Sequence, residues 1–390
     1  MRVASYCRLL APQGSRVFAL ATILVAIIML APARSNAQHY VQTNLVSDIP
    51  GLAPTTDPNL VNPWGLTRTA GSPWWVANNG TETSTLYNGL GQRFPIATPL
   101  VVAIPGGAPT GTVANTSTDF QLTTGNPARF IFVTEEGTIS GWNPTVNPTN
   151  AVIKFTAPTG TANYKGVTIA QRNGANFLYV ANFFSGQVDV FDGSFAPVSL
   201  PGGAFTDPSL PPDFAPFNVQ NINGDVWVMY AMQNEEKEDE VAGPGLGYVD
   251  KFDANGVLLL QLNSGRWMNA PWGIALAPSD FGKESGRLLV GQFGSGQIAT
   301  FDEQHGNFHG LLRGLLGQPL EIEGLWAIAF GNNGNAGPAN ALFFTAGIDD
   351  EEHGLFGKIT PALKGQAKKT LPTNVVAPLF STTDRVKMRP

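Results

Sequence analysis

A chain of 390 residues with a formal net charge of −6 and no basic cluster argues against a nucleic-acid partner. Charged residues make up only 13% of the sequence, which also holds 44 glycines and 30 prolines, and this composition excludes an architecture of long helices. We therefore expect an all-β fold.

The first 37 residues have the order typical of a secretory signal peptide. Three arginines precede an apolar run over residues 17–30, and small residues follow it. The run of about fourteen residues is shorter than the roughly twenty that cross a bilayer. We expect cleavage after Ala37, with Ala33 as the alternative cleavage site, secretion into the periplasm or medium, and no membrane span in the mature chain. A retained anchor is the alternative to cleavage. Cys7, the only cysteine, would leave with this segment.

Short β-branched and aromatic segments follow, each bounded by Gly, Asn or Pro. They include residues 130–134, 177–182, 225–230, 287–293 and 341–347. Six related segments recur roughly fifty residues apart: Pro63-Trp64-Gly65-Leu66, Pro109-Thr110-Gly111-Thr112, Tyr164-Lys165-Gly166-Val167, Pro216-Phe217-Asn218-Val219, Pro271-Trp272-Gly273-Ile274 and Leu325-Trp326-Ala327-Ile328. We call the second residue of each segment its anchor. Four short antiparallel strands per repeat predict a six-bladed β-propeller over residues 38–361, followed by a tail over 362–390.

Each repeated segment is expected to form the inner strand of a blade. Its third residue is usually small, because inner strands converge on the central channel. The aromatic anchors, such as Trp64, Trp272 and Trp326, are expected to wedge between neighbouring blades. Residues 40–47 form a further strand-like segment, which we predict to be the outermost strand of the last blade, closing the ring.

Three acidic segments follow the second strand of alternate repeats: Glu135 with Glu136, residues 234–240, and residues 349–354. The repeat alignment predicts that they gather on one face. Because clustered carboxylates repel and Ca²⁺ prefers oxygen ligands, the face is a candidate calcium site. The alternative is three solvated loops that keep the protein soluble. The predicted metal ligands are Glu135, Glu235, Asp349 and Asp350, and the predicted ligand-binding residues are Asn62, Asn163, Glu136 and Glu236.

The sequence has few patterns typical of catalysis, and we assign no catalytic residue. The histidines of the mature chain, His39, His305, His309 and His353, have no spacing with Ser or Asp that predicts a nucleophilic triad, and no G-x-S-x-G motif is present.

Four stretches carry a family resemblance: "NLVSDIPGLAPTTDPNLVNPWGL", "RFIFVTEEGTISGWNP", "YKGVTIA" and "LYVANFFSGQVDVFD". They resemble a family of secreted bacterial conserved hypothetical proteins, some of which carry a PEP-type C-terminal sorting tail, and the blade pattern is similar to NHL-repeat propellers. The resemblance implies a secreted six-bladed propeller with no established catalytic residues. The residues after Pro361 lack the apolar span of such a tail.

Three functions fit these observations. The favoured hypothesis is a non-catalytic binding module that presents loops on one face to an extracellular glycan, peptide or protein partner. A calcium-dependent hydrolase or lactonase is the second, although alanine or glycine stands at four of the six starts of the inner strands, where such an enzyme needs polar groups. A structural envelope component is the third.

Overall fold

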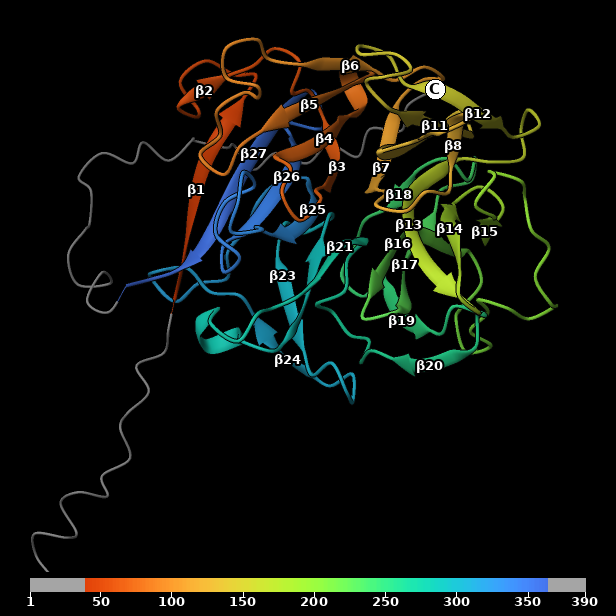
Figure 1. Ribbon diagram of the computed structural model, residues 1–390. Coiled ribbons are helices and arrows are strands. Elements are labelled where there is room, and N and C mark those ends of the chain that lie inside the picture. Colours follow the sequence, from red (N-terminus) through yellow and green to blue (C-terminus); the bar gives the residue numbers. More distant parts are fainter. Residues whose placement is uncertain (1–38, 364–390) are drawn as a thin grey trace, which may run out of the picture. The chain divides into compact units, whose positions relative to one another are not determined.

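The computed structural model describes residues 39–363, and these residues form six mainly antiparallel blade sheets around a common centre, with a separate two-stranded hairpin (Figure 1). This confirms the predicted all-β, six-bladed propeller. No helix in residues 39–363 is long and apolar enough to cross a membrane. The expected signal peptide and C-terminal tail lie outside the described residues, apart from positions 362 and 363 of the tail.

Each blade runs outward from an inner strand that contains one of the repeated segments. Blade 1 holds β3 (Pro63–Thr67), β4 (Trp74–Asn78), β5 (Thr83–Tyr87) and β6 (Val101–Ala103). Blade 2 holds β7 (Pro109–Ala114), β10 (Phe130–Thr134), β11 (Thr138–Trp142) and β12 (Val152–Thr156), with the hairpin β8 (Gln121–Thr123) and β9 (Asn126–Pro127) inserted. Blade 3 holds β13 (Tyr164–Arg172), β14 (Ala175–Asn182) and β15 (Gln187–Phe191).

The second half of the ring repeats the plan. Blade 4 holds β16 (Phe214–Ile222), β17 (Asp225–Gln233), β19 (Tyr248–Phe252) and β20 (Leu258–Gln261), and the short β18 (Glu240–Val241) pairs with β17. Blade 5 holds β21 (Pro271–Leu276), β22 (Leu288–Gln292), β23 (Ile298–Phe301) and β24 (Phe308–Leu311). Blade 6 holds β25 (Leu325–Phe330), β26 (Leu342–Ile348) and β27 (His353–Pro361).

The N-terminal segment closes the ring as predicted. Strand β1 (Tyr40–Ser47) pairs antiparallel with β27 and adds β2 (Thr55–Thr56) at its far edge. Figure 1 shows the two ends of the propeller side by side, β1 in red and β27 in blue. The Tyr40 hydroxyl also donates to the Phe281 carbonyl at 2.8 Å, which ties this strand to blade 5.

Blade 3 departs from the expected four strands. After β15 the chain pairs only at Phe191 with Pro197, and then runs as a loop to Asp213. The loop contains Pro197, Pro201, Gly202 and Gly203. Proline cannot donate to a strand ladder and glycine favours other backbone conformations, so no fourth strand forms here.

The core lies between the blades. Six buried apolar clusters each join two neighbouring sheets, so that every blade is packed on both faces. At the inner strands, the backbones of neighbouring blades approach too closely for a side chain. A Cβ on Gly65 would lie 2.5 Å from the Thr110 carbonyl, and one on Gly273 would lie 2.5 Å from the Trp326 carbonyl. The convergence inferred from the small residues is therefore present.

The predicted position of the aromatic anchors is wrong. Trp64 stacks on Trp326 with ring centroids 3.5 Å apart, and both contact Trp272 and Phe217. These four residues come from blades 1, 4, 5 and 6, so the rings meet inside the channel rather than between blades. A register shift follows the start of every inner strand. Such a bulge redirects the side chain beside it, here into the channel.

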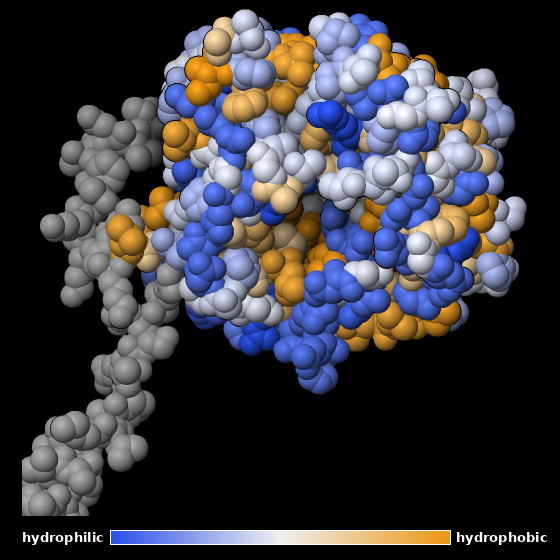
Figure 2. All heavy atoms as spheres, viewed as in Figure 1, coloured by the Kyte–Doolittle hydropathy of each residue, from blue (hydrophilic) through white to orange (hydrophobic). Residues whose placement is uncertain are grey.

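The aromatic plug, which we define as Trp64, Phe217, Trp272 and Trp326, divides the channel into two ends. One end lies where the inner strands begin, together with the loops between the second and third strands of the blades. The other lies toward the C-terminal ends of the inner strands. Figure 2 shows that the face turned to the viewer is hollowed near its middle, with apolar residues inside the hollow.

Candidate functional site at the channel mouth

A buried lysine is the centre of the candidate site. Lys165 occupies the anchor position of blade 3 and is 0% exposed. Its Nζ atom lies 5.1 Å from the centre of the Trp64 ring, at the surface of the aromatic plug. A buried ammonium group is unfavourable unless it is paired, so its surroundings must supply negative charge.

Acidic side chains from two other blades supply that charge. Glu135, at the end of β10, forms a short ion pair with Lys165 through Oε1 and accepts a hydrogen bond from Asn79 Nδ2 at 2.9 Å through Oε2. Asp239, in the loop after β17, places Oδ1 3.8 Å from Lys165 Nζ. The side chain of Asp239 is 72% exposed, so the cluster reaches solvent on this side.

The third acidic loop joins the cluster through Asn62. Glu351, between β26 and β27, accepts a hydrogen bond from Asn62 Nδ2 at 2.6 Å, and Asn62 Oδ1 accepts one from Trp326 Nε1 at 3.0 Å. Asn62 therefore links blade 6 to the aromatic plug. The backbone of Asp349, Asp350 and Glu351 is left-handed throughout, with φ of 57°, 52° and 67°. Three such residues in succession are unfavourable for L-amino acids, and tertiary contacts must hold the loop in place.

Burial and neighbouring charges both shift the pKa values of these groups. Burial alone would lower the pKa of Lys165, but Glu135, Glu240 and Asp239 raise it above its ordinary value, so the lysine stays protonated. Burial raises the pKa of Glu240 to about 8, with Lys165 acting in the opposite direction and Glu351 and Asp239 adding to the rise. Burial also raises the pKa of Glu351, opposed by the Asn62 hydrogen bond and assisted by Glu135.

We define the channel mouth as Lys165, Glu135, Asp239, Glu240 and Glu351, with Asn62 and Asn79. Four carboxyl groups surround one ammonium group. Glu240 is protonated near neutral pH, and the other three still give the mouth an excess of negative charge. Perturbed pKa values in a partly enclosed site are typical of functional sites. The lysine cannot act as a nucleophile while it stays protonated, whereas Glu240 can exchange a proton near neutral pH.

Two of the four predicted ligand-binding residues lie in or beside the channel mouth, and the other two lie on the surrounding loops. Asn62 lies within the mouth, and Asn163 lies at its edge, where Nδ2 donates to the Glu238 carbonyl at 3.4 Å. The Asn163 side chain is 8% exposed, and its Oδ1 atom has no hydrogen-bond partner in the described part of the chain. Glu136 and Glu236 are exposed on the surrounding loops.

The four predicted metal ligands do not form a calcium cage in this arrangement. Both oxygens of Glu135 are engaged, by Lys165 and by Asn79. Glu235, Asp349 and Asp350 are exposed on their loops. Within residues 39–363, no three His, Cys, Asp or Glu side chains are grouped so that they could hold a metal ion. The geometry therefore gives this set no support, and the calcium site stays a prediction.

Sequence reasoning missed Lys165, Asp239, Glu240, Glu351 and Asn79. A signal was present for Lys165, because it stands where three other repeats have tryptophan. A single charged residue among aromatic equivalents indicates a special environment. The repeat alignment predicted that the acidic loops share one face of the propeller. It did not indicate which acidic side chain of each loop points toward the channel.

No family model matches the chain. It is 31% identical over 325 residues to an uncharacterised protein of Acanthamoeba polyphaga mimivirus, covering 81% of this chain and 78% of that protein. It is also 31% identical over 326 residues to a second uncharacterised protein of the same virus, covering 81% of this chain and 84% of that protein.

Among solved structures, the fold is similar to that of a protein of unknown function from Bacteroides thetaiotaomicron. The TM-score is 0.52 at 12% identity, over 83% of this chain and 76% of that one, and this likeness concerns the fold alone. The two sequence relatives are viral, so they do not support the bacterial origin implied by the family resemblance. The chain belongs to the family of uncharacterised proteins that these two mimivirus proteins represent.

Proposed function

We propose that the protein is a non-catalytic binding module, and that its channel mouth takes a cationic group of a peptide or protein partner. The observation that carries this proposal is the meeting of Glu135, Asp239 and Glu351 from three alternate blades around one buried lysine. Their excess negative charge selects against anions and favours an ammonium or guanidinium group. The mouth is therefore matched to basic side chains.

The available groups favour a partner that approaches from solvent. Glu135 is occupied by Lys165 and Asn79, but Asp239 is largely exposed and Glu351 is half-buried. The exposed acids around the mouth, Glu136, Glu235, Glu236, Glu238, Asp349 and Asp350, extend the negative potential outward. Such a field steers a cationic partner toward the mouth and weakens as salt is added.

Titration calorimetry with N-acetylated tri-lysine amide tests this proposal, with the tri-glutamine peptide as the neutral control. Binding of tri-lysine alone is expected. Asp239→Asn and Glu351→Gln should each weaken it by roughly three- to tenfold, because each removes one attractive charge. Asp280→Asn is the matched control, since Asp280 is exposed in the connection between β21 and β22, toward the other end of the inner strands. Equal binding by wild type and both mouth variants would refute the proposal.

A hydrolase is the second candidate, favoured by one observation. A carboxyl group with a pKa of about 8, as for Glu240, is suited to act as a general acid near neutral pH. A panel of esters and lactones, assayed with Ca²⁺ and with a chelator, tests this candidate. Turnover that disappears in Glu240→Gln would favour it over the binding module.

Export through residues 1–37 is part of the proposal. It is supported by the order of basic, apolar and small residues in that segment. N-terminal sequencing of the protein recovered from an expressing culture should begin at Gln38, whereas a protein that retains Met1 would argue against cleavage.

A further inference from the structure

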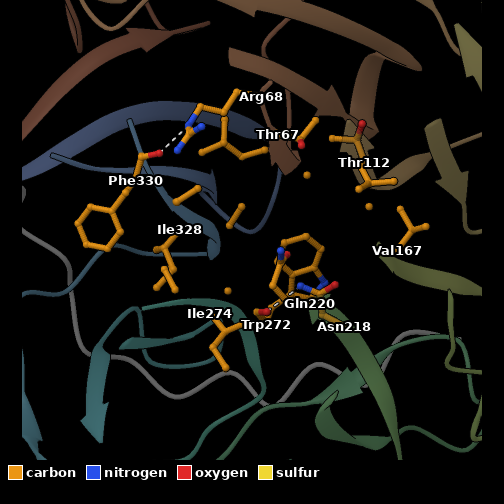
Figure 3. A pocket seen from close by; sticks show the side chains of 18 of the residues that line it. Thr67, Arg68, Thr112, Val167, Asn218, Gln220, Trp272, Ile274, Ile328 and Phe330 are labelled. Atoms are coloured by element: carbon orange, nitrogen blue, oxygen red, sulfur yellow. Dashed lines mark hydrogen bonds between the residues drawn. The ribbon is translucent and has the colours of Figure 1, made fainter. Parts of the chain in front are cut away.

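A cavity of about 340 Å³ lies at the end of the channel opposite the acidic mouth. All six inner strands contribute to its wall, through residues that follow the anchors toward the C-terminal ends of the strands. Figure 3 shows these side chains arranged around the cavity, among them Thr67, Arg68, Thr112 and Gln220. This volume falls in the lower part of the range of small-molecule pockets.

Among the residues of the described chain that line this cavity, Arg68 alone is charged. Its Nε atom donates to the Phe330 carbonyl at 2.7 Å (Figure 3). Its Nη2 atom donates to the Gly331 carbonyl at 2.9 Å. Both partners are neutral, and neither bond uses Nη1. Burial lowers the pKa of Arg68, and no acidic group opposes that shift. The guanidinium group also lies over the Trp74 ring, 5.7 Å from its centre, but no carboxylate among the described residues forms an ion pair with it.

Neutral polar groups line the cavity from other blades, and Gln220 on β16 of blade 4 lies across the ring from Arg68 in blade 1 (Figure 3). Gln220 makes only a long hydrogen bond, from Nε2 to the Asn221 carbonyl at 3.4 Å, so its amide has capacity for another partner. Thr112 lies on β7 of blade 2, next to blade 1, and its hydroxyl donates to the Ile131 carbonyl at 3.1 Å. Apolar residues, including Ile274 and Ile328, complete the wall. The lining therefore combines one cation, a few polar groups and apolar surface, as small-molecule sites do.

We propose that this cavity binds a small organic anion, whose carboxylate or phosphate group pairs with Arg68. The two carbonyl groups hold the planar guanidinium through Nε and Nη2, so Nη1 is oriented for the ligand before it arrives. The Gln220 amide donates to the same ligand. The site is separate from the channel mouth, because the aromatic plug lies between them.

Titration calorimetry with citrate, succinate and inorganic phosphate tests this inference, at an ionic strength held constant with sodium chloride and with glycerol as the neutral control. At least one of the anions is expected to bind the full chain. Arg68→Gln should weaken that binding by about tenfold or more, and Arg68→Lys should recover only part of it, because lysine keeps the charge but loses the planar guanidinium. Arg266→Gln, at an exposed arginine, is the matched control.

A second variant addresses the risk that Arg68→Gln disturbs the seam between blades 1 and 6. Gln220→Trp leaves Arg68 intact, removes the Gln220 amide and narrows the cavity, so it should weaken anion binding by about tenfold or more. Asp239→Asn and Glu351→Gln should leave anion affinity unchanged, which separates this inference from the proposed function. The inference fails if none of the three anions binds wild type, or if Arg68→Gln and Gln220→Trp both bind as wild type does.

Discussion

The anchor position of the blades holds different kinds of residue with different roles. In three blades this position holds tryptophan and in one it holds phenylalanine, and these rings fill the channel. In blade 3 it holds Lys165, whose ammonium group lies over the Trp64 ring and pairs with acidic side chains from other blades. Replacing an apolar side chain by a charged one thus converts a packing position into the base of a polar site.

Glu240 makes the stability of the fold depend on pH. Its pKa is raised from 4.5 to about 8 on folding, so the folded state holds this proton more tightly than the unfolded chain does. The resulting contribution is fully present below pH 4.5 and is lost as pH rises through about 8. Glutamine resembles the protonated form and cannot lose the proton.

Glu240→Gln should therefore match wild type in thermal stability at pH 5 and exceed it at pH 9, by roughly 2–5 °C in Tm. Differential scanning calorimetry at the two pH values measures this difference. Glu236→Gln, at an exposed position in the same loop, should show the pH dependence of wild type. A Glu240→Gln variant that tracks wild type at both pH values would show that this carboxyl is ionised in the fold.

Which side chains face the channel could not be read from the sequence. Strand alternation assigns faces only while the register is regular, and the bulge beside each anchor reverses the expected direction. The sequence also did not predict that the Glu351 side chain points toward the channel, because its loop adopts an unusual left-handed backbone. Loop conformation of this kind is set by tertiary contacts rather than by local residue preference.

At the scale of the elements, the repeat spacing was sufficient to place all six inner strands and the closing strand. The prolines and glycines of residues 197–203 indicated that blade 3 lacks a fourth strand. The regular spacing of the anchors nevertheless led us to predict four strands in every blade. The hairpin of β8 and β9 was not foreseen, because it is an insertion that no other blade repeats.

Strand β1 should be essential for stability. It covers the edge of β27 over seven residue pairs and anchors blade 5 through Tyr40. Deleting residues 38–48 should lower Tm by roughly 10 °C or more, because it exposes the edge and opens the ring. Thermal denaturation followed by circular dichroism measures the change. Thr43→Ala, which alters an exposed side chain of the same strand, should leave Tm within about 2 °C. An unchanged Tm after the deletion would show that the ring does not depend on this closure.

At the scale of the whole molecule, the propeller brings together loops that are about a hundred residues apart in sequence. Glu135, Asp239 and Glu351 meet because blades 2, 4 and 6 present equivalent loops to one end of a common axis. The other end gathers the C-terminal halves of the inner strands around Arg68. One ring therefore carries a negative and a positive site, separated by the aromatic plug.

The pH dependence of tri-lysine binding reports on the charge of the channel mouth itself. Loss of the Glu240 proton adds one negative charge, so the N-acetylated tri-lysine amide should bind wild type on the order of tenfold more tightly at pH 9 than at pH 6. The gain should be absent in Glu240→Gln. Equal affinities at the two pH values in wild type, or a gain that persists in Glu240→Gln, would contradict a cation-binding mouth.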